Sequence, residues 1–293
     1  MTDVRYPDSD AAPLGVAVGA RPLGVASASA RSALLTILGE FVGPRRQAVW
    51  TSTLLRALAA IGVEHKAARQ AISRMAQEGL LESERSGRRV RWSLTVGGAT
   101  LLREGADRIY GFLREDRSWD GRWLVVNVAV PEVQRSLRHR LRTQLTWLGM
   151  GSPAPGLWVI PDADKEGAVL GVLEELGLRS NAFAWIGSWV PVEDVQSLIS
   201  AAWTLDELAA QYRDFTTWVA GMAPLTSAET FVAQVALVHE WRRFPFLDPV
   251  LPASLLPSDW PATCAVDAFI DNHARWHDAA QAQWEVWAAE EVG

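Results

Sequence analysis

Residues 64–94 have the sequence EHKAARQAISRMAQEGLLESERSGRRVRWSL, and this stretch decides the expected fold of the N-terminal part of the chain. At about 100° per residue, a helix over residues 64–78 places four apolar side chains on one side: Ala68, Ala71, Ile72 and Met75. The opposite side carries Lys66, Arg69, Gln70, Ser73 and Gln77, with Arg74 at its edge. Gly79 follows at a position where helix ends favour glycine. The pattern predicts a helix with one apolar face and one basic, amide-bearing face.

The second half of the same stretch predicts a short β-hairpin. The Ser86-Gly87 pair is a turn signal between two runs that are typical of strands. Arginines gather at and just behind the expected tip: Arg85, Arg88, Arg89 and Arg91. A basic hairpin that follows a basic-faced helix is the order found in a winged helix-turn-helix.

Two more helices are expected upstream, over residues 30–42 and 51–61, with Thr51 or Ser52 as the N-cap of the second. A basic turn that contains Arg45 and Arg46 joins them. Residues 30–95 are therefore predicted to form a winged helix-turn-helix domain. Residues 1–29, rich in Ala, Gly, Pro, Asp and Ser, are predicted to be a flexible tail.

These side chains suit contact with double-stranded DNA, because the major groove admits an α-helix and offers base-edge donors and acceptors. Arg69 and Arg74 match guanine and Gln70 matches adenine, while Lys66 and Ser73 suit phosphates or base edges. His65 stands at the expected helix start. The hairpin arginines, with Arg45 and Arg46, are predicted to reach the DNA backbone or the minor groove. The alternative is a solvated basic face that touches nothing.

The charge distribution favours the DNA interpretation although the net charge is −6. Residues 29–118 carry 15 Arg/Lys and 9 Asp/Glu, which gives a net charge of +6. Residues 201–293 carry 4 and 13, which gives −9. A basic segment attached to an acidic body is the pattern expected of a nucleic-acid-binding protein.

The remainder of the chain is predicted to hold three further units, so the expected fold class is α+β. Residues 96–118 form a connector or dimer helix capped by Thr95. Residues 119–192 alternate strands and helices as β-α-β-α-β, consistent with a ferredoxin-like domain. Residues 193–293 are mainly helical, with a capping box at residues 226–229, and form the expected effector and dimerisation domain.

Several function classes are disfavoured by composition. The longest apolar stretch is shorter than the about 20 residues that a membrane helix needs. The single cysteine, Cys264, excludes an internal disulfide, fits a reducing cytoplasm and is expected to be buried. His273 and His277 share a helix face, but no third ligand lies in register. No metal site, cofactor or enzymatic activity is predicted.

The chain resembles the PaaX family of bacterial regulators. The resemblance lies in residues 68–75 (ARQAISRM), in Glu78-Gly79-Leu80-Leu81, in the Gly87-Arg88-Arg89 turn and, most specifically, in residues 239–260, HEWRRFPFLDPVLPASLLPSDW. It covers nearly the whole chain beyond residue 29. The resemblance implies a dimeric repressor of phenylacetate or related aromatic catabolism. It also implies release by an aryl-CoA thioester such as phenylacetyl-CoA.

A candidate effector site follows from the C-terminal cluster. Two adjacent arginines could hold CoA phosphates, and nearby aromatic rings could line an apolar slot. The candidate residues are His239, Trp241, Arg242, Arg243, Phe246 and Trp260. The structural alternative pairs the arginines with Asp248 or Glu240 and places the rings in the core.

The predicted function is that of a homodimeric repressor that binds an inverted-repeat operator through two winged helices. One alternative is a protein-interaction adaptor whose winged helix binds protein. A second is a metal-dependent nuclease, because the middle domain also resembles small CRISPR-associated nucleases. Those place an Asp at the end of the first strand, where this chain has Asn127. Without that carboxylate, a divalent ion lacks a charged ligand there.

Overall fold

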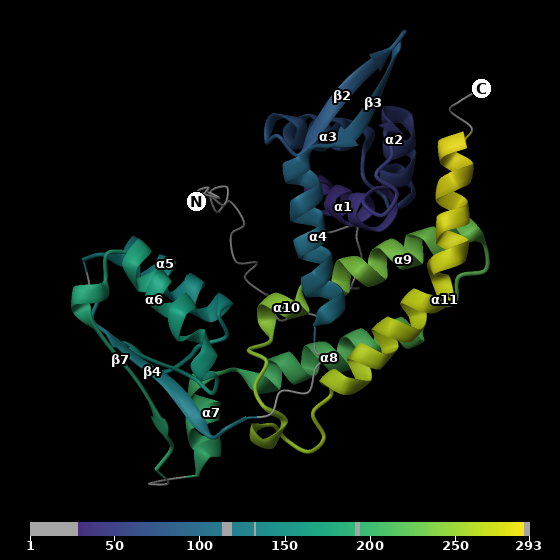
Figure 1. Cartoon of the computed structure of the whole chain (residues 1–293). Coiled ribbons are helices and arrows are strands. Elements are labelled where there is room, and N and C mark those ends of the chain that lie inside the picture. Colours follow the sequence, from purple (N-terminus) through teal and green to yellow (C-terminus); the bar gives the residue numbers. More distant parts are fainter. Residues whose placement is uncertain (1–28, 113–118, 132, 191–193, 290–293) are drawn as a thin grey trace.

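The computed structural model describes residues 29–112, 119–131, 133–190 and 194–289 (Figure 1). The described part combines helices with two antiparallel sheets, which confirms the α+β class. Of the predicted tail, only Ser29 lies within the described residues. No helix in the described ranges combines the length and apolar character needed to cross a lipid bilayer.

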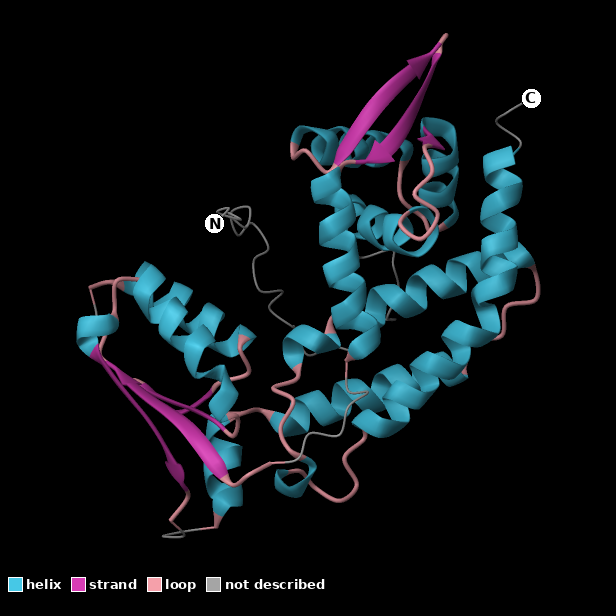
Figure 2. Ribbon diagram, viewed as in Figure 1, coloured by secondary structure: helices cyan, strands magenta, loops and turns pink. Residues whose placement is uncertain are grey.

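The N-terminal unit consists of three helices and a hairpin (Figure 2). Its helices are α1 (Ala30–Ile37), continued by the π-helical segment η2 (Leu38–Val42), then α2 (Thr51–Ala60) and α3 (His65–Gln77). The hairpin pairs β2 (Leu81–Ser86) with β3 (Arg89–Leu94), as predicted. A two-residue strand that the sequence did not predict, β1 (Val49–Trp50), pairs with the other edge of β3.

The predicted N-cap of α2 is wrong. Trp50 occupies the cap position and no side chain caps the helix. The Thr51 hydroxyl instead donates to the Val90 carbonyl oxygen at 2.9 Å and accepts from the Trp92 indole N–H at 2.9 Å. Thr51 therefore connects the start of α2 to β3 of the hairpin.

Helix α4 (Val96–Gly111) leads from the hairpin toward the rest of the molecule (Figure 1). Thr95 caps it as predicted, because its hydroxyl accepts from the Gly98 N–H at 3.0 Å. The helix ends at Gly111, and Phe112 is already extended. The rest of the predicted connector, residues 113–118, lies outside the described residues.

The middle unit is a four-stranded antiparallel sheet in the order β5-β6-β4-β7. Its strands are β4 (Arg122–Val128), β5 (Gly151–Ala154), β6 (Leu157–Ile160) and β7 (Ala182–Ser188). Its helices are α5 (Arg135–Trp147) and α6 (Glu166–Glu175), with short 3-10 turns η3 (Ala163–Lys165) and η4 (Arg179–Asn181). The chain order is thus β-α-β-β-α-β, and β5 is a strand that the sequence analysis missed.

Both faces of that sheet are packed at β4 and β6, whereas β7 is mostly exposed. Leu124, Val126 and Val128 of β4 form a core with Leu141, Leu145, Val169 and Leu173 of α5 and α6. On the other face, Trp123 and Val159 pack against Ile199 of α7 (Val195–Ala202) and against Leu251 and Leu255. The second contact joins the middle unit to the C-terminal part.

The C-terminal part is helical, as predicted. It contains α8 (Leu205–Ala220), α9 (Ser227–Trp241), the short α10 (Phe244–Leu247), the 3-10 turn η5 (Ala253–Leu255) and the long α11 (Ala262–Ala289). The predicted capping box is confirmed, with the Thr226 hydroxyl and the Glu229 carboxylate each accepting from the other's backbone N–H. Tyr212, Phe215, Trp241 and Phe269 lie in the core that these helices share.

The N-terminal unit shares its hydrophobic core with two C-terminal helices. Phe231 of α9 and Trp284 of α11 belong to the same buried cluster as the apolar side chains of α1, α2 and α3. The Phe41 ring lies 4.7 Å from the Phe231 ring and 5.4 Å from the Trp284 ring, centroid to centroid. Residues 30–95 therefore pack as one body with α9 and α11, an association that the sequence analysis did not predict.

Candidate nucleic-acid interface

Helix α3 presents the two faces that its sequence predicts. Ala68, Ala71, Ile72 and Met75 are buried against the rest of the N-terminal unit. The predicted contact residues are all exposed: His65, Lys66, Arg69, Gln70, Ser73 and Arg74. Within the described chain, the side chains of Lys66, Arg69 and Arg74 make no hydrogen bond or ion pair. Their donors are directed to solvent and are available to an anionic partner.

The acids at the two ends of α3 do not cancel this positive face. Glu64 and Glu78 are the N-cap and C-cap residues. The Glu78 carboxylate accepts from the Arg31 guanidinium at 2.7 Å, so its charge is neutralised from α1. The exposed side of α3 between the caps carries Lys66, Arg69 and Arg74 as its charged groups.

The hairpin turns through Gly87 and Arg88, with Ser86 and Arg89 as the closing pair. Gly87 has φ = +62°, a conformation that glycine adopts at low cost. Arg85, Arg88 and Arg89 are exposed around this tip. Figure 1 shows the hairpin projecting beyond the helices, beside α3. The tip therefore presents a second basic surface adjacent to the exposed face of α3.

Arg91 differs from the other predicted hairpin contacts because it has a partner within the hairpin. Its guanidinium donates to the Glu84 carboxylate across the hairpin at 2.8 and 3.0 Å. The hydrogen bonds and charge of the partner raise the pKa of Arg91 and lower the pKa of Glu84. Arg91 is thus already paired within the hairpin, whereas Arg85 and Arg88 have no side-chain partner among the described residues.

The turn residues Arg45 and Arg46 differ in what they contact. Arg46 is exposed, with φ = +50°. Arg45 instead points to α11, where its guanidinium donates to Gln281 and pairs with Glu285 at 2.7 Å. The DNA contact of Arg45 stays a prediction, and in this structure its charge joins the N-terminal unit to the C-terminal helix.

The predicted effector cluster is divided by the structure. The Arg242 guanidinium donates to the Ser32 carbonyl oxygen and the Thr36 hydroxyl of α1, at 3.0 and 2.9 Å. The His239 Nδ1 lies 3.2 Å from the same Thr36 hydroxyl. Trp241 is buried in the C-terminal core. These three residues hold α9 against α1 or fill the core, so they do not line a ligand site.

The other three candidates lie elsewhere and apart. Arg243 pairs with Glu240 at 3.1 Å and donates to Gln211, which matches the structural alternative. Phe246 is exposed, and the Arg108 guanidinium lies 5.2 Å from the centre of its ring. Trp260 lines an open cleft between α8 and the start of α11. The six candidates therefore do not form one pocket.

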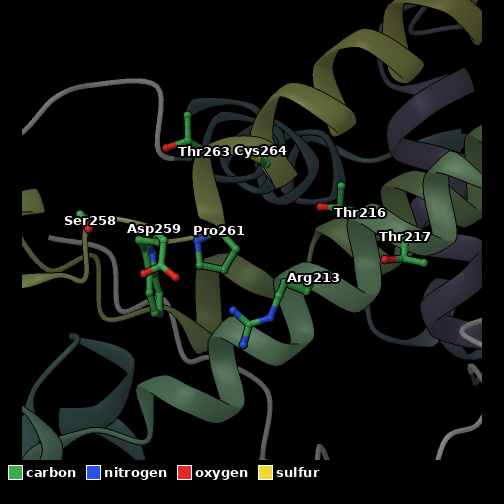
Figure 3. A pocket seen from close by; sticks show the side chains of 9 residues that line it. Arg213, Thr216, Thr217, Ser258, Asp259, Pro261, Thr263 and Cys264 are labelled. Carbon is green, nitrogen blue, oxygen red and sulfur yellow. The ribbon is translucent and has the colours of Figure 1, made fainter.

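The cleft has a volume of about 660 Å³. Figure 3 shows the side chains that line it. Its wall on α8 carries Arg213, Thr216 and Thr217. The opposite wall is made by the segment before α11 and its first turn: Ser258, Asp259, Trp260, Pro261, Thr263 and Cys264. Cys264 is exposed here, which corrects the expectation that it is buried. The cleft combines one cation (Arg213), one carboxylate (Asp259), several hydroxyls and one large ring.

A buried polar cluster was missed by the sequence analysis. We define the Glu40 cluster as Glu40, Tyr110, Gln234, His273 and Gln281. The Glu40 carboxylate accepts from Tyr110 and from Gln234 (3.1 Å), and lies 3.0 Å from the His273 Nε2. Burial alone would raise the pKa of Glu40, but the hydrogen bond and charge of His273, with the bonds from Tyr110 and Gln234, outweigh it and lower the pKa. The sequence signal for this cluster was Glu40 itself, a single acid among the apolar residues of η2.

The middle unit places Asn127 on β4, exposed and opposite Phe183 of β7 and Leu157 of β6. It brings no carboxylate to the position expected of a nuclease metal ligand. His273 and His277 lie with ring centroids 5.8 Å apart. Across the described ranges, no group of three or more His, Cys, Asp or Glu side chains is placed to hold a metal ion.

Three family models match successive parts of the chain. They are described as PaaX-like protein (residues 29–98), PaaX protein central Cas2-like domain (residues 116–199) and PaaX-like protein C-terminal domain (residues 203–286). The transcriptional repressor PaaX of Escherichia coli (strain K12) is 29% identical over 266 residues, which is 87% of this chain and 82% of the relative.

A solved structure shows a similar fold. The uncharacterized protein Rv0674 from Mycobacterium tuberculosis aligns with a TM-score of 0.59 and 24% identity. The alignment covers 86% of this chain and 99% of that chain. At this level of identity the likeness concerns the fold alone.

Proposed function

The chain belongs to the PaaX family, and we propose that it is a sequence-specific DNA-binding transcriptional repressor. The observation that carries the proposal is the exposed face of α3, where Lys66, Arg69 and Arg74 have no partner among the described residues. In a winged helix-turn-helix, this helix lies in the major groove and the hairpin contacts the adjacent backbone or minor groove. The order α1, α2, α3, β2, β3 provides the elements in that sequence.

The β-α-β-β-α-β middle unit has the element order of a ferredoxin-like domain, and we assign that fold to it. A homodimer would place two α3 helices on an inverted-repeat operator, with half-sites about one helical turn apart or a multiple of it. The controlled genes are proposed to serve phenylacetate or related aromatic catabolism, in accordance with the family resemblance.

The DNA interface is tested with the double variant Arg69→Ala/Arg74→Ala and fluorescence anisotropy on the DNA upstream of the operon that encodes the chain. Loss of two base contacts should weaken operator binding by at least about 30-fold, since each bidentate pair contributes about 1–3 kcal/mol. Arg142→Ala is the matched control, because Arg142 is an exposed arginine on α5 of the middle unit.

The salt dependence separates DNA readout from general electrostatics. Wild-type binding should fall steeply with salt and keep a preference for the operator over unrelated DNA. Equal affinity of wild type and double variant, or no sequence preference at any salt concentration, would refute the proposal. Unchanged DNA affinity would favour the adaptor alternative, in which the same face binds protein.

The effector is proposed to be an aryl-CoA thioester bound in the cleft between α8 and α11. A volume of about 660 Å³ is within the range of small-molecule sites. Arg213 could bind a phosphate, the hydroxyls of Thr216, Thr217, Ser258 and Thr263 could donate to polar groups, and Trp260 offers a ring face.

A thermal-shift titration with phenylacetyl-CoA tests this site, with CoA and phenylacetate as comparison ligands. Ligand that binds the folded state raises the melting temperature by mass action. Arg213→Ala should reduce the shift, whereas Arg275→Ala, an exposed arginine further along α11, should not. Equal melting-temperature shifts in the two variants would show that the ligand does not bind in this cleft. That result would leave the DNA-binding proposal unaffected.

A further inference from the structure

The Glu40 cluster lies where the N-terminal unit meets three elements from other parts of the chain. Glu40 belongs to η2, Tyr110 to α4, Gln234 to α9, and His273 and Gln281 to α11. The carboxylate is bonded from α4, α9 and α11 at once. The chain has therefore placed one buried carboxylate at the junction through which the DNA-binding unit is attached to the rest of the molecule.

The backbone of Glu40 makes a second contact with α11. Glu40 lies in the π-helical segment η2, and Pro44, four residues on, has no N–H to donate to its carbonyl oxygen. The Gln281 side-chain amide donates to this carbonyl oxygen at 3.1 Å. Glu40 thus holds α11 at His273 and at Gln281, two turns apart on the same helix.

These two contacts span the boundary between two apolar cores along α11. Phe269 and Trp276 pack in the C-terminal core, whereas Ala280, Trp284 and Trp287 pack in the core of the N-terminal unit. Apolar burial is non-directional and depends mainly on area. It holds α11 against the N-terminal unit, but it specifies the axial position of the helix only weakly.

Buried ionic groups contribute little net stability, because removing two charges from water costs about as much as their attraction returns. Their best-attested role is to fix which of several packings is adopted. The Gln234 side-chain oxygen is buried without a partner among the described residues. A cluster that leaves such an acceptor unpaired is not one optimised for stability alone.

We propose that Glu40 is a positioning residue that fixes the register of α11 and α4 against the DNA-binding unit, and so sets the position of α3 relative to the body. The proposal concerns geometry and not folding stability. The distance measurement described below is independent of the proposed DNA-binding function. The operator-affinity measurement rests on that function.

Two variants separate register from stability. The first is Glu40→Gln, which keeps the side-chain volume. The second is Glu40→Met combined with Tyr110→Phe, Gln234→Leu and His273→Leu, which replaces the cluster by apolar groups and leaves no orphaned partner. Thr53→Val is the control, because Thr53 is a buried polar residue of α2 whose hydroxyl has no partner in the described structure.

The first measurement needs no DNA. Nitroxide labels are placed at Glu82→Cys on β2 and Asp214→Cys on α8, in a Cys264→Ser background. Double electron–electron resonance between them reports the distance from the N-terminal unit to the C-terminal helices. Wild type and Thr53→Val should give one narrow distribution. The apolar variant should give a broadened or shifted distribution at an unchanged or higher melting temperature, and Glu40→Gln an intermediate one.

The second measurement compares operator and half-site DNA. The apolar variant should lose about tenfold in affinity for the full operator and keep its affinity for a half-site. A distance distribution identical to wild type in both variants would overturn the proposal, as would a fall in melting temperature with no change in distance. Failure of the wild type to bind any operator would refute the DNA-binding function and leave the distance test standing.

Discussion

His239 of α9 faces Thr36 of α1. Burial and the nearby charges of Arg242 and Arg243 lower the pKa of His239 to about 4. The unfolded chain takes up a proton on this histidine as the pH falls through about 6.5, whereas the folded chain resists protonation until about 4. The unfolded state therefore binds more protons within this window. Folding stability should fall as the pH decreases from about 7 toward 4.

His239→Asn should remove this part of the pH dependence while keeping a group that can bond to the Thr36 hydroxyl. Between pH 7 and pH 5, the wild type should lose on the order of 1–2 kcal/mol more unfolding free energy than the variant. Urea unfolding at several pH values measures the difference. Parallel pH profiles would show that His239 titrates normally in the folded protein.

Glu84 and Arg91 give a second prediction at this scale, because the ion pair occupies a hairpin cation that is proposed to contact DNA. Glu84→Gln should raise operator affinity by about threefold to tenfold at low salt and steepen the salt dependence, since it removes an acid and releases Arg91. Anisotropy titrations provide the measurement. Glu82→Gln, which also removes an acid from β2, is the control, and an equal gain there would mean that Arg91 is not the cause.

The exposure of Lys66, Arg69 and Arg74 could be predicted because it depends only on the periodicity of one helix. The position of Arg45 could not, because its partner Gln281 lies 236 residues later in the chain. Arg242 was misassigned for the same reason, since its acceptors are in α1. Side chains whose partners are remote in sequence carry no local signal of their contacts.

At the scale of elements, the junction between the hairpin and α4 depends on a glycine. A Cβ added at Gly98 would lie 2.1 Å from the Leu80 carbonyl oxygen, which is backbone and cannot move aside cheaply. The Leu80 carbonyl also accepts from the Thr95 N–H at 3.1 Å, so the two segments are fixed together. Position 98 therefore requires glycine because the Leu80 backbone lies too close for a Cβ atom, and not because the chain needs flexibility there.

Gly98→Ala should therefore destabilise the protein by about 3 kcal/mol or more, in the range of overpacked or strained core sites. Gly97→Ala is the matched control on the same turn, where a Cβ would meet only the Thr95 hydroxyl oxygen at 3.8 Å. That control should be neutral or stabilising by about 0.5–1 kcal/mol. Chemical unfolding compares the two, and equal effects would contradict the predicted clash.

Most helices could be placed from sequence, whereas the short strands could not. Strand β5 consists of Gly-Ser-Pro-Ala, a composition typical of loops, and β1 has two residues. Both exist because a neighbouring strand offers backbone partners, so tertiary pairing overrides local propensity. The N-cap of α2 was misplaced similarly, because Thr51 bonds to β3 and not to its own helix.

At the scale of the whole molecule, the N-terminal unit and the C-terminal helices share one core. Trp284 of α11 stacks on Phe41, and Phe231 of α9 packs against both rings. The sequence predicted residues 30–95 as a separate domain because each of its helices has an apolar face. It gave no indication that part of this surface is covered from the C-terminal end of the chain.

Trp284→Ala should consequently lower operator affinity as well as stability, although Trp284 is 193 residues or more from any predicted DNA contact in the chain. Removal of a buried Trp side chain typically costs about 3–5 kcal/mol. Thermal unfolding and anisotropy measure the two effects. Val286→Ala, at a half-exposed position on the same helix, should change neither, and full retention of operator affinity in Trp284→Ala would argue against a shared core.

The length of α11 has a mechanical consequence. Its 28 residues extend over about 42 Å, with the first turn in the cleft and the last turns beside α2. Figure 1 shows α11 bent near its middle, so each half forms an arm of about 21 Å, and a tilt of about 5° would displace the end of an arm by about 2 Å. Displacements of this size are typical of helices that transmit allosteric signals. A change in the width of the cleft would thereby be accompanied by a shift where the last turns of α11 pack beside α2.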